Sequence, residues 1–332
     1  MVFAQIREAY GAVDPVCFPL IWADRKFDRE KRAEFGVATI AFRHIPLPPH
    51  PAKGVSLPPG ESDLTPIPRR SCCLCSTKAA RHGDGESFKV GMVYVGTSGW
   101  AYSLWKPEFY PSDLSSSRFL SFYSTQLNAV EVNYTFCGRH VLSRHMADRW
   151  LAQTPDHFLF AFRGPKPISH FHRYRLRNAE TRVGEFGLAL RPFQDRNRLG
   201  PVLFQLPRTF TIAPAALEDF LRTWPRGLRV SFEFRHPSWF TDATYEILRH
   251  HRAGLCLAER DEMATPGVLT APFVYLRLRK SHYTTGALRQ LRERVQRYAK
   301  GGDVFAFFHQ DNVEGPLCAR ELLRNVEWTR AA

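Results

Sequence analysis

The feature that most constrains this chain is an alternation of short apolar runs with longer amphipathic stretches, which begins near Met92. The runs are rich in β-branched and aromatic residues, as buried strands are. In chain order they are MVYVGT, AVEVNYTF, HFLFAFR, PVLFQL, RVSFEF, GLCLAE, PFVYLRLR and DVFAFFH. Because these runs are apolar almost throughout, we predict eight parallel strands that are buried on both faces.

The stretches between the runs carry apolar residues at helical spacing. In the first of them, residues 115–127, a row of serines suited to a helix N-cap precedes the apolar residues. The same pattern predicts helices over residues 141–153, 213–224, 243–251, 284–302 and 317–328. Eight strand–helix units over about 240 residues match the usual size of a (β/α)8 barrel. We therefore predict an α/β protein with a single TIM-like barrel over residues 92–330. An open doubly wound sheet, the competing architecture, fits less well because no glycine-rich phosphate loop is present.

Residues 1–90 differ in composition from the rest of the chain. Between Arg43 and Glu86 the sequence consists mainly of prolines, glycines and small polar residues. Such a stretch buries too little apolar surface to offset the entropy lost on ordering. We expect a mostly disordered N-terminal extension or a mis-called start, with Met92 as the natural beginning.

The chain is basic, with 46 Lys and Arg against 32 Asp and Glu and a formal net charge of +14. This surplus favours a small anionic ligand and leaves nucleic acid open as a partner, although an arginine-rich solvated surface explains it equally well. No run reaches the roughly 18 to 20 apolar residues of a membrane helix, and no signal peptide is recognisable. We expect a soluble cytoplasmic protein without a membrane partner. Its oligomeric state stays open.

The candidate active site follows from the barrel, because active sites of such barrels lie at the carboxyl-terminal ends of the strands. Glu131 and Glu233 each alternate with apolar neighbours within a run, so their side chains should point into the barrel. A carboxyl group there must be paired or protonated. Pairing with Arg235 or Arg277 for structure alone and a shared catalytic role both stay open. We expect these four side chains to gather at one rim.

Further candidates come from the polar and aromatic residues around the strand ends. His236 is the third candidate catalytic residue, as a proton carrier, with an ordinary surface histidine as the alternative. The tryptophans serve either as packing or as a stacking platform. The predicted substrate-binding residues are Trp100, Tyr102, Asn133, Arg163, His170, Gln205, Arg235, Arg277 and Tyr283.

The sequence predicts no cofactor. The glycine-rich signatures GxGxxG and GxxxxGK[ST], which bind dinucleotides and phosphates, are absent. A divalent metal would need ligands that converge from several strand ends, and no short HxH, HxxE or DxD motif joins two of them. The residues available for such a set are Glu131, His170, Glu233, His236, Asp261 and His309.

Seven motifs in order resemble the domain-of-unknown-function family 72, the YecE-like family, over about residues 92–325. They are VYVGTSGWAYSLWKPEFYP, VEVNYTF, FLFAFRGPKPISH, LFQLP, FEFRHPSWF, YLRLR with a following Tyr, and a final F-x-H, GP and Ala element. The resemblance implies a TIM-like barrel with a pocket at the strand ends and no established activity. It implies that the characteristic polar positions are Glu131, Asn133, His170, Gln205, Glu233, Arg235, His236, Arg277 and Tyr283. Two positions depart from many relatives: Arg163 replaces a lysine, and Gln310 replaces a carboxylate.

The leading hypothesis is an uncharacterised YecE-like barrel protein that acts as an enzyme on a small or medium anionic substrate, phosphorylated or nucleic-acid-derived. Arginines would grip the anion, and Glu131 and Glu233 would share acid–base work. A hydrolase or a lyase would fit, and the sequence leaves open whether the chain is an enzyme. One alternative is glycoside hydrolysis by the same two glutamates. Another is a non-catalytic module that binds nucleic acid or protein.

Overall fold

The computed structural model describes residues 91–136, 142–169, 180–260, 264–309 and 312–326. The predicted N-terminal extension, residues 1–90, lies outside this part of the chain. The same holds for His170 among the predicted site residues, for Asp261 and for Gln310.

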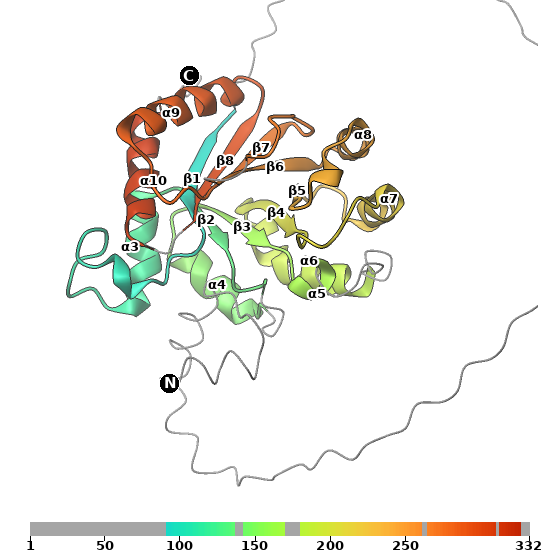
Figure 1. Cartoon of the computed structure of the whole chain (residues 1–332). Helices are drawn as coiled ribbons and strands as arrows, with labels where there is room; N and C mark the ends of the chain where they lie inside the picture. Colours follow the sequence, from blue (N-terminus) through green and yellow to red (C-terminus); the bar gives the residue numbers. More distant parts are fainter. Residues whose placement is uncertain (1–90, 137–141, 170–179, 261–263, 310–311, 327–332) are drawn as a thin grey trace, which may run out of the picture. The chain divides into compact units, whose positions relative to one another are not determined.

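Eight parallel strands form a ring at the centre of the described chain (Figure 1). Their order around the sheet is β1-β8-β7-β6-β5-β4-β3-β2, so neighbours in sequence are neighbours in space. The predicted eight-stranded α/β barrel is thus confirmed. The strands are β1 (Val93–Thr97), β2 (Ala129–Val132), β3 (Leu159–Arg163), β4 (Leu199–Gln205), β5 (Val230–Glu233), β6 (Gly254–Glu259), β7 (Phe273–Leu278) and β8 (Asp303–Phe308).

The ring closes between β1 and β2 largely through side chains. One parallel bridge joins Ser98 and Glu131 at the end where the strands finish. Nearer their start, the side-chain amide of Asn128 donates to the carbonyl oxygen of Val93 at 2.9 Å and accepts from the amide of Val95 at 2.7 Å. Asn128 therefore makes the pair of hydrogen bonds that a residue of the next strand would make.

Tyr123 supports the same junction. Its hydroxyl accepts from the backbone amide of Thr97 at 2.8 Å and donates to the carbonyl oxygen of Ala129 at 3.0 Å. Gly96 faces that carbonyl so closely that any side chain at this position would collide with it. Glycine in β1 is thus required by the close approach of β2.

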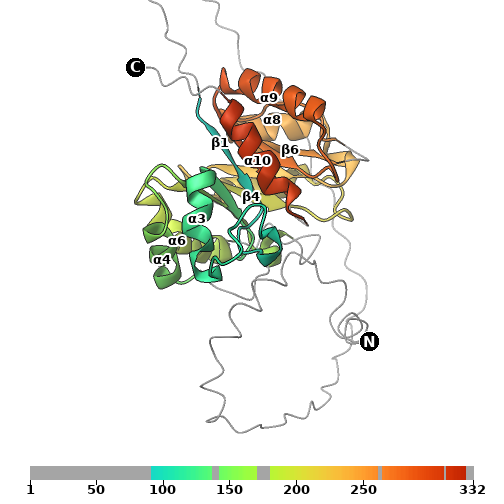
Figure 2. The same cartoon turned by 90° about the vertical axis from the view of Figure 1, so that its left-hand side faces the viewer.

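Helices surround the ring (Figures 1 and 2). The α-helices are α3 (Phe119–Gln126), α4 (Arg144–Ala152), α5 (Lys166–Ser169), α6 (Glu180–Gln194), α7 (Pro214–Thr223), α8 (Asp242–His250), α9 (Thr285–Ala299) and α10 (Glu314–Asn325). The 3-10 helices are η2 (Ser103–Trp105), η3 (Ser116–Arg118) and η4 (Pro237–Trp239). No helix in the described residues has the length and apolarity needed to cross a bilayer.

Two connections differ from the predicted pattern. Helix α6 is absent from the predicted set because Gly184, Gly187 and Pro192 interrupt its sequence. Between β6 and β7, residues 264–272 contain no helix, so this unit departs from the expected strand–helix repeat. The segment carries Pro266 and Gly267, which disfavour a helix. The segment instead lies alongside β6 in space, because Thr270 Oγ1 accepts a hydrogen bond from the amide of Leu255 at 2.8 Å.

Strand alternation divides the apolar residues between two sides of the sheet. The larger set packs between the strands and the helices and includes Val130, Phe160 and Phe232. The smaller set fills the barrel interior, and we call it the interior cluster. Its members are Ala129, Leu159, Ala161, Leu203, Cys256, Phe273, Tyr275, Phe305 and Phe307.

Candidate functional site

A layer of polar side chains lies inside the barrel where the strands finish, and we call it the polar layer. Each member stands two residues after a small or apolar residue of the same strand. Because side chains alternate between the two faces of a strand, each member points into the barrel interior. All members are at most 4 % exposed. They are Glu131 on β2, Arg163 on β3, Gln205 on β4, Glu233 on β5 and Arg277 on β7.

Arg277 joins the two glutamates across the barrel. Its Nη2 lies 2.6 Å from Oε1 of Glu131, and its Nη1 lies 2.6 Å from Oε2 of Glu233. β2 and β7 are not neighbours in the sheet, so the contact with Glu131 spans the interior. Of the two arginines considered from the sequence as partners, Arg277 makes both ion pairs.

Both carboxyl groups are held in the ionised state. Burial raises the pKa of each, but the surrounding arginines outweigh burial. Arg277 and Arg163 lower the pKa of Glu131, and Arg279, Arg277 and Arg260 hold the pKa of Glu233 well below its ordinary value. In turn, the two carboxylates raise the pKa of Arg277 against the effect of its burial. The layer thus contains a buried, mutually compensating charge triad.

Neutral donors complete the environment of Glu131. Ser98 Oγ donates to Oε1 at 2.5 Å, and the hydroxyl of Tyr275 donates to Oε2 at 2.8 Å. The amide of Asn133 donates to Ser98 Oγ at 3.0 Å. Gly99, whose φ of +95° favours glycine, makes the turn directly after Ser98. Every oxygen of Glu131 is therefore hydrogen-bonded, as a buried carboxylate requires.

A second chain of hydrogen bonds runs through Arg163. Its Nη1 donates to Oδ1 of Asn133 at 3.0 Å, and its Nη2 donates to Oε1 of Gln205 at 2.9 Å. The side-chain Nε2 of Gln205 in turn donates to Oε2 of Glu233 at 2.8 Å. The guanidinium also lies over the ring of Phe136, 3.6 Å from its centroid. Arg163 thus donates to two neutral amide oxygens, and no carboxylate of the described residues forms an ion pair with it.

Positive charge exceeds negative charge around the layer. Arg260 pairs with Glu233 at 2.8 Å, and Arg279 lies 3.9 Å from the same carboxylate. Burial and the neighbouring Arg277 lower the pKa of Arg163 to about 9 and that of Arg279 to about 10. Burial and the neighbouring Arg260 lower the pKa of Arg235. Among the residues that the structure describes, five guanidinium groups therefore surround two carboxylates.

Several of these guanidinium groups have an unused donor. The Nε atoms of Arg163, Arg235 and Arg279 are buried, and each lacks a hydrogen-bond partner among the described residues. A buried donor left unpaired costs free energy, on the order of 1–3 kcal/mol. Such donors, together with the excess charge, are suited to an anion.

His309 follows β8 and belongs to the same electrostatic environment. Burial lowers the pKa of His309 to about 2, and the nearby Arg279, Arg277 and Arg163 act in the same direction. The imidazole is therefore neutral at neutral pH. A neutral imidazole can accept or donate a hydrogen bond without adding to the positive charge.

The predicted aromatic residues after β1 are packed against their surroundings. Trp100 is buried and meets Trp150 edge to face, with 5.0 Å between the ring centroids. The hydroxyl of Tyr102 donates to the backbone oxygen of Ser98 at 2.9 Å. Their binding roles stay predictions.

No hydrogen bond or ion pair joins His236 or Tyr283 to the polar layer among the described residues. His236 caps η4, where its Nδ1 lies 2.8 Å from Ser238 Oγ. Tyr283 is buried against Phe308, with ring centroids 5.3 Å apart. Both follow strand ends, as the sequence indicates, and their proposed roles stay predictions.

Four residues of the charge network were not among the predicted site residues. Tyr275 and Arg279 lie two residues before and after Arg277, so strand alternation alone would have placed all three on one inward stripe. Ser98 directly follows β1. Arg260, which follows β6, carries no comparable signal, because its contact with Glu233 depends on how the β6–β7 connection leaves the barrel.

A cavity of about 1150 Å³ opens at the other end of the barrel, where the strands begin. Its lining includes Tyr94, Asn128 and Leu159, together with Gly91 and Val326, where the described chain begins and ends. The buried ion pairs of the described residues lie at the opposite end. The cavity and the buried charged side chains therefore lie at opposite ends of the barrel. We take the polar layer as the candidate site because it holds the groups that can bind a ligand or transfer a proton.

Parallel strands closed around an interior, with a buried polar layer at their carboxyl-terminal ends, define the class of barrel that places binding sites at that end. The family described as "Protein of unknown function DUF72" matches residues 94–332. The chain belongs to this family, as the resemblance predicted.

Two curated relatives support the family assignment. The chain is 32% identical over 157 residues to the UPF0759 protein YecE of Escherichia coli K12, covering 47% of this chain and 53% of YecE. It is 27% identical over 161 residues to the UPF0759 protein YunF of Bacillus subtilis, covering 47% and 55%. The chain thus spans about half the length of the curated relatives it matches.

Solved structures show the same fold. A DUF72 family protein from Thermotoga maritima superposes with a TM-score of 0.62 at 24% identity, covering 70% of this chain and 98% of that protein. A DUF72 family protein from Enterococcus faecalis gives a TM-score of 0.57 at 19% identity, covering 71% and 99%. At these identities the likeness supports the fold alone.

Proposed function

We propose that the polar layer and the arginines beside it bind the anionic group of a small or medium substrate, phosphorylated or nucleic-acid-derived, and that acid–base chemistry follows there. The observation that carries the proposal is the charge imbalance among the described residues: five guanidinium groups surround Glu131 and Glu233, and three of the five have a buried Nε without a described partner. Guanidinium forks match the oxygens of phosphate and carboxylate groups. An anion would satisfy those donors and relieve the repulsion between the arginines.

The lowered pKa values shape the chemistry that we propose. Glu131 and Glu233 are ionised, so they are suited to accept a proton and not to donate one. An anion that draws Arg277 away from a carboxylate would raise the pKa of that carboxyl group and make it a better base. In this proposal His236 carries the second proton transfer, and the reaction is that of a hydrolase or a lyase.

Two other hypotheses for the polar layer, a glycoside hydrolase and a metal site, are less favoured. A glycoside hydrolase needs one of its two carboxyl groups protonated, with a raised pKa. Here both pKa values are lowered. A divalent metal would meet the same excess of positive charge that favours an anion. We therefore propose a layer that works without a metal or another cofactor.

Titration of the full chain with inorganic phosphate, followed by calorimetry, tests the anion site. Arg163→Gln and Arg279→Gln should each weaken binding at least about tenfold, because a charge-assisted hydrogen bond contributes about 1.5–3 kcal/mol. Arg289, exposed on α9, provides the matched control. Arg289→Gln removes the same charge and should leave the affinity unchanged. Equal weakening in all three variants would reduce the effect to net charge and refute the site.

The salt dependence of binding separates this proposal from a nucleic-acid-binding module. A small anion held by a few arginines should lose little affinity as salt increases. A single-stranded oligonucleotide that contacts several phosphates should give a logarithmic slope of about −0.7 per phosphate. Tight oligonucleotide binding with a steep slope, unaffected by Arg163→Gln, would favour the module.

A further inference from the structure

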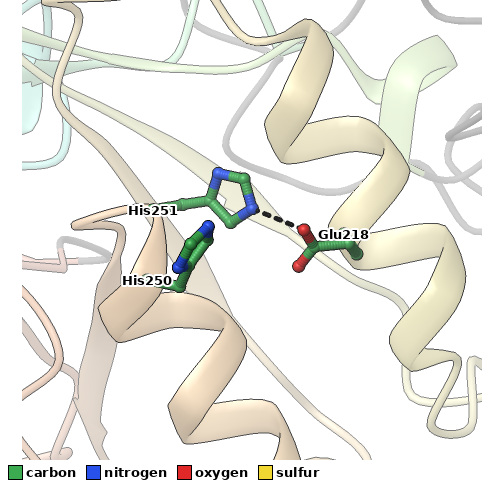
Figure 3. A group of neighbouring side chains, drawn as sticks. All are labelled: Glu218, His250 and His251. Atoms are coloured by element: carbon green, nitrogen blue, oxygen red, sulfur yellow. Dashed lines mark hydrogen bonds and ion pairs between the residues drawn. The ribbon is translucent and has the colours of Figure 1, made fainter. Parts of the chain in front are cut away.

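A second cluster of chemically active side chains lies outside the barrel, on the layer of helices. It consists of Glu218 on α7 and of His250 and His251 at the end of α8 (Figure 3). One ligand atom of each residue lies within 4.8 Å of the ligand atoms of the other two. β6 begins at Gly254, only three residues later, so the cluster lies toward the end of the barrel where the strands begin, away from the polar layer.

A helix-to-helix ion pair explains only part of this arrangement. His251 Nε2 lies 3.0 Å from Oε1 of Glu218, and this contact accounts for these two residues. It does not account for His250, whose exposed imidazole lies beside that of His251, with ring centroids 4.9 Å apart, and within reach of the same carboxylate (Figure 3). Two imidazoles and one carboxylate from two helices form a recurrent ligand set.

The ligand types select the metal. Imidazole nitrogen suits zinc, copper, nickel and cobalt, whereas magnesium and calcium prefer sets made of oxygen alone. We propose that Glu218, His250 and His251 bind a divalent transition metal ion, with zinc as the physiological candidate, and that the ion links α7 to α8.

The geometry requires a small adjustment. Zinc lies about 2.0–2.2 Å from nitrogen and oxygen ligands, so tetrahedral neighbours are separated by about 3.3 Å. The 3.0 Å contact between His251 and Glu218 is already close to this value. His250 is exposed and can rotate, so its ring can close the remaining gap. Three protein ligands would leave the fourth position of the ion to water.

Charge around the cluster both prepares the site and competes for it. Hydrogen bonding from His251 and the nearby Arg222 lower the pKa of Glu218, so the ligand is ionised at neutral pH. Arg222 Nε also donates to Oε1 of Glu218, at 3.1 Å, from the next turn of α7. The Arg222 side chain is 67% exposed, so it can leave when an ion binds. Removal of this cation should therefore strengthen metal binding.

Titration of the full chain with Co²⁺ and with Zn²⁺ tests the proposal. Co²⁺ bound by nitrogen and oxygen ligands absorbs in the visible range without thiolate charge-transfer bands. Its spectrum therefore distinguishes this cluster from the thiols of Cys72, Cys73 and Cys75, which could also bind metal. We expect one Co²⁺ per chain with the thiolate-free spectrum.

Variants decide which residues hold the ion. His251→Ala and Glu218→Gln should each weaken binding by at least about tenfold, because even the loss of an outer-shell partner costs about 10- to 100-fold. His250→Ala should weaken it as well, and this separates a metal site from a simple ion pair of His251 and Glu218. His145, exposed on α4, is the matched control, and His145→Ala should change nothing.

Arg222→Ala should have the opposite effect on metal affinity, because it keeps all three ligands and removes the competing cation. We expect an affinity for Co²⁺ about two- to tenfold higher, from the loss of one nearby positive charge. Absence of a thiolate-free cobalt spectrum would overturn the proposal. So would equal binding by the chain and the His250→Ala/His251→Ala variant.

Discussion

The interior of this barrel has two halves that the same strands build in opposite ways. Where the strands begin, the interior cluster is apolar, with Leu203 and Phe305 among its members. Two residues further along, the same stripes carry the charges of Glu131, Glu233 and Arg277. The apolar half is stabilised by removal of surface from water, whereas the polar half balances a large desolvation cost against ion pairs. The polar half is thus the half whose stability depends on a balance between charges.

The largest expected effect comes from breaking the charge balance of the polar half. Arg277→Met leaves two buried carboxylates without their shared partner, so we expect the free energy of unfolding in urea to fall by about 3–5 kcal/mol. A double variant that adds only Glu131→Gln removes one negative charge together with the positive one and leaves Glu233 paired with Arg260, so it should recover part of the loss. A double variant as unstable as Arg277→Met would show that shape, and not charge balance, holds this half together.

The apolar half should respond by a different mechanism. Leu203→Ala opens a cavity in the interior cluster, where Leu203 is fully buried, and should cost about 3 kcal/mol. Because no charge changes, we expect the same cost at pH 7 and pH 4 and an unchanged affinity for phosphate. Leu188→Ala on the exposed face of α6 is the control and should stay within about 0.5 kcal/mol. A loss of phosphate affinity in Leu203→Ala would mean that the two halves are coupled.

The pH dependence of stability should belong to the polar half. The pKa values of Glu131 and Glu233 are lowered in the folded chain, so the unfolded chain binds more protons in acid. Their contribution is complete above the ordinary glutamate pKa of about 4.3 and is lost as the pH falls through the lowered values. Each unit of lowering corresponds to about 1.4 kcal/mol. Urea unfolding from pH 7 to pH 3 should therefore show a steep acid limb.

The Arg277→Met/Glu131→Gln double variant provides the comparison for this measurement. It should show a shallower acid limb, with a remainder from carboxyl groups such as that of Glu259, whose pKa is also lowered, by Lys280 and Arg294 against burial. An acid limb of unchanged steepness would place the responsible carboxyl groups outside the polar layer.

How far the sequence predicts this molecule depends on whether a feature is local to one strand. The inward direction of Glu131 follows from its apolar neighbours within one run, so it could be predicted, as could the eight strands. The choice of Arg277 over Arg235 as partner could not, because it depends on which strands face each other across the interior. The cluster of Glu218 with His250 and His251 was missed for the same reason, since two separate helices bring it together.

The β6–β7 connection shows the opposite limit. Eight apolar runs suggest eight equal units, yet Pro266 and Gly267 disfavour a helix there, and the structure has none over residues 264–272. The signal was present in the sequence, but the regularity of the other units obscured it. Arg260, which reaches Glu233 from the start of this connection, could be found only from the structure.

The smallest expected effect is at the boundary between the two halves, where Tyr275 belongs to both. Its ring lies in the interior cluster, and its hydroxyl donates to Glu131 at 2.8 Å. Tyr275→Phe keeps the ring and removes one donor from a buried carboxylate, so urea unfolding should show a loss of about 1.5 kcal/mol. The pKa of Glu131 should rise with it and move the acid limb to higher pH.

Tyr94 is the matched control for this substitution. It packs against the same interior cluster, and its hydroxyl makes no hydrogen bond to a described residue, so Tyr94→Phe should change stability by no more than about 0.5 kcal/mol. Equal losses in the two variants would show that the hydrogen bond from Tyr275 to Glu131 is not the cause of the loss. A loss confined to Tyr275→Phe, with a shifted acid limb, would show that the apolar half holds the carboxylate of the polar half in its ionised state.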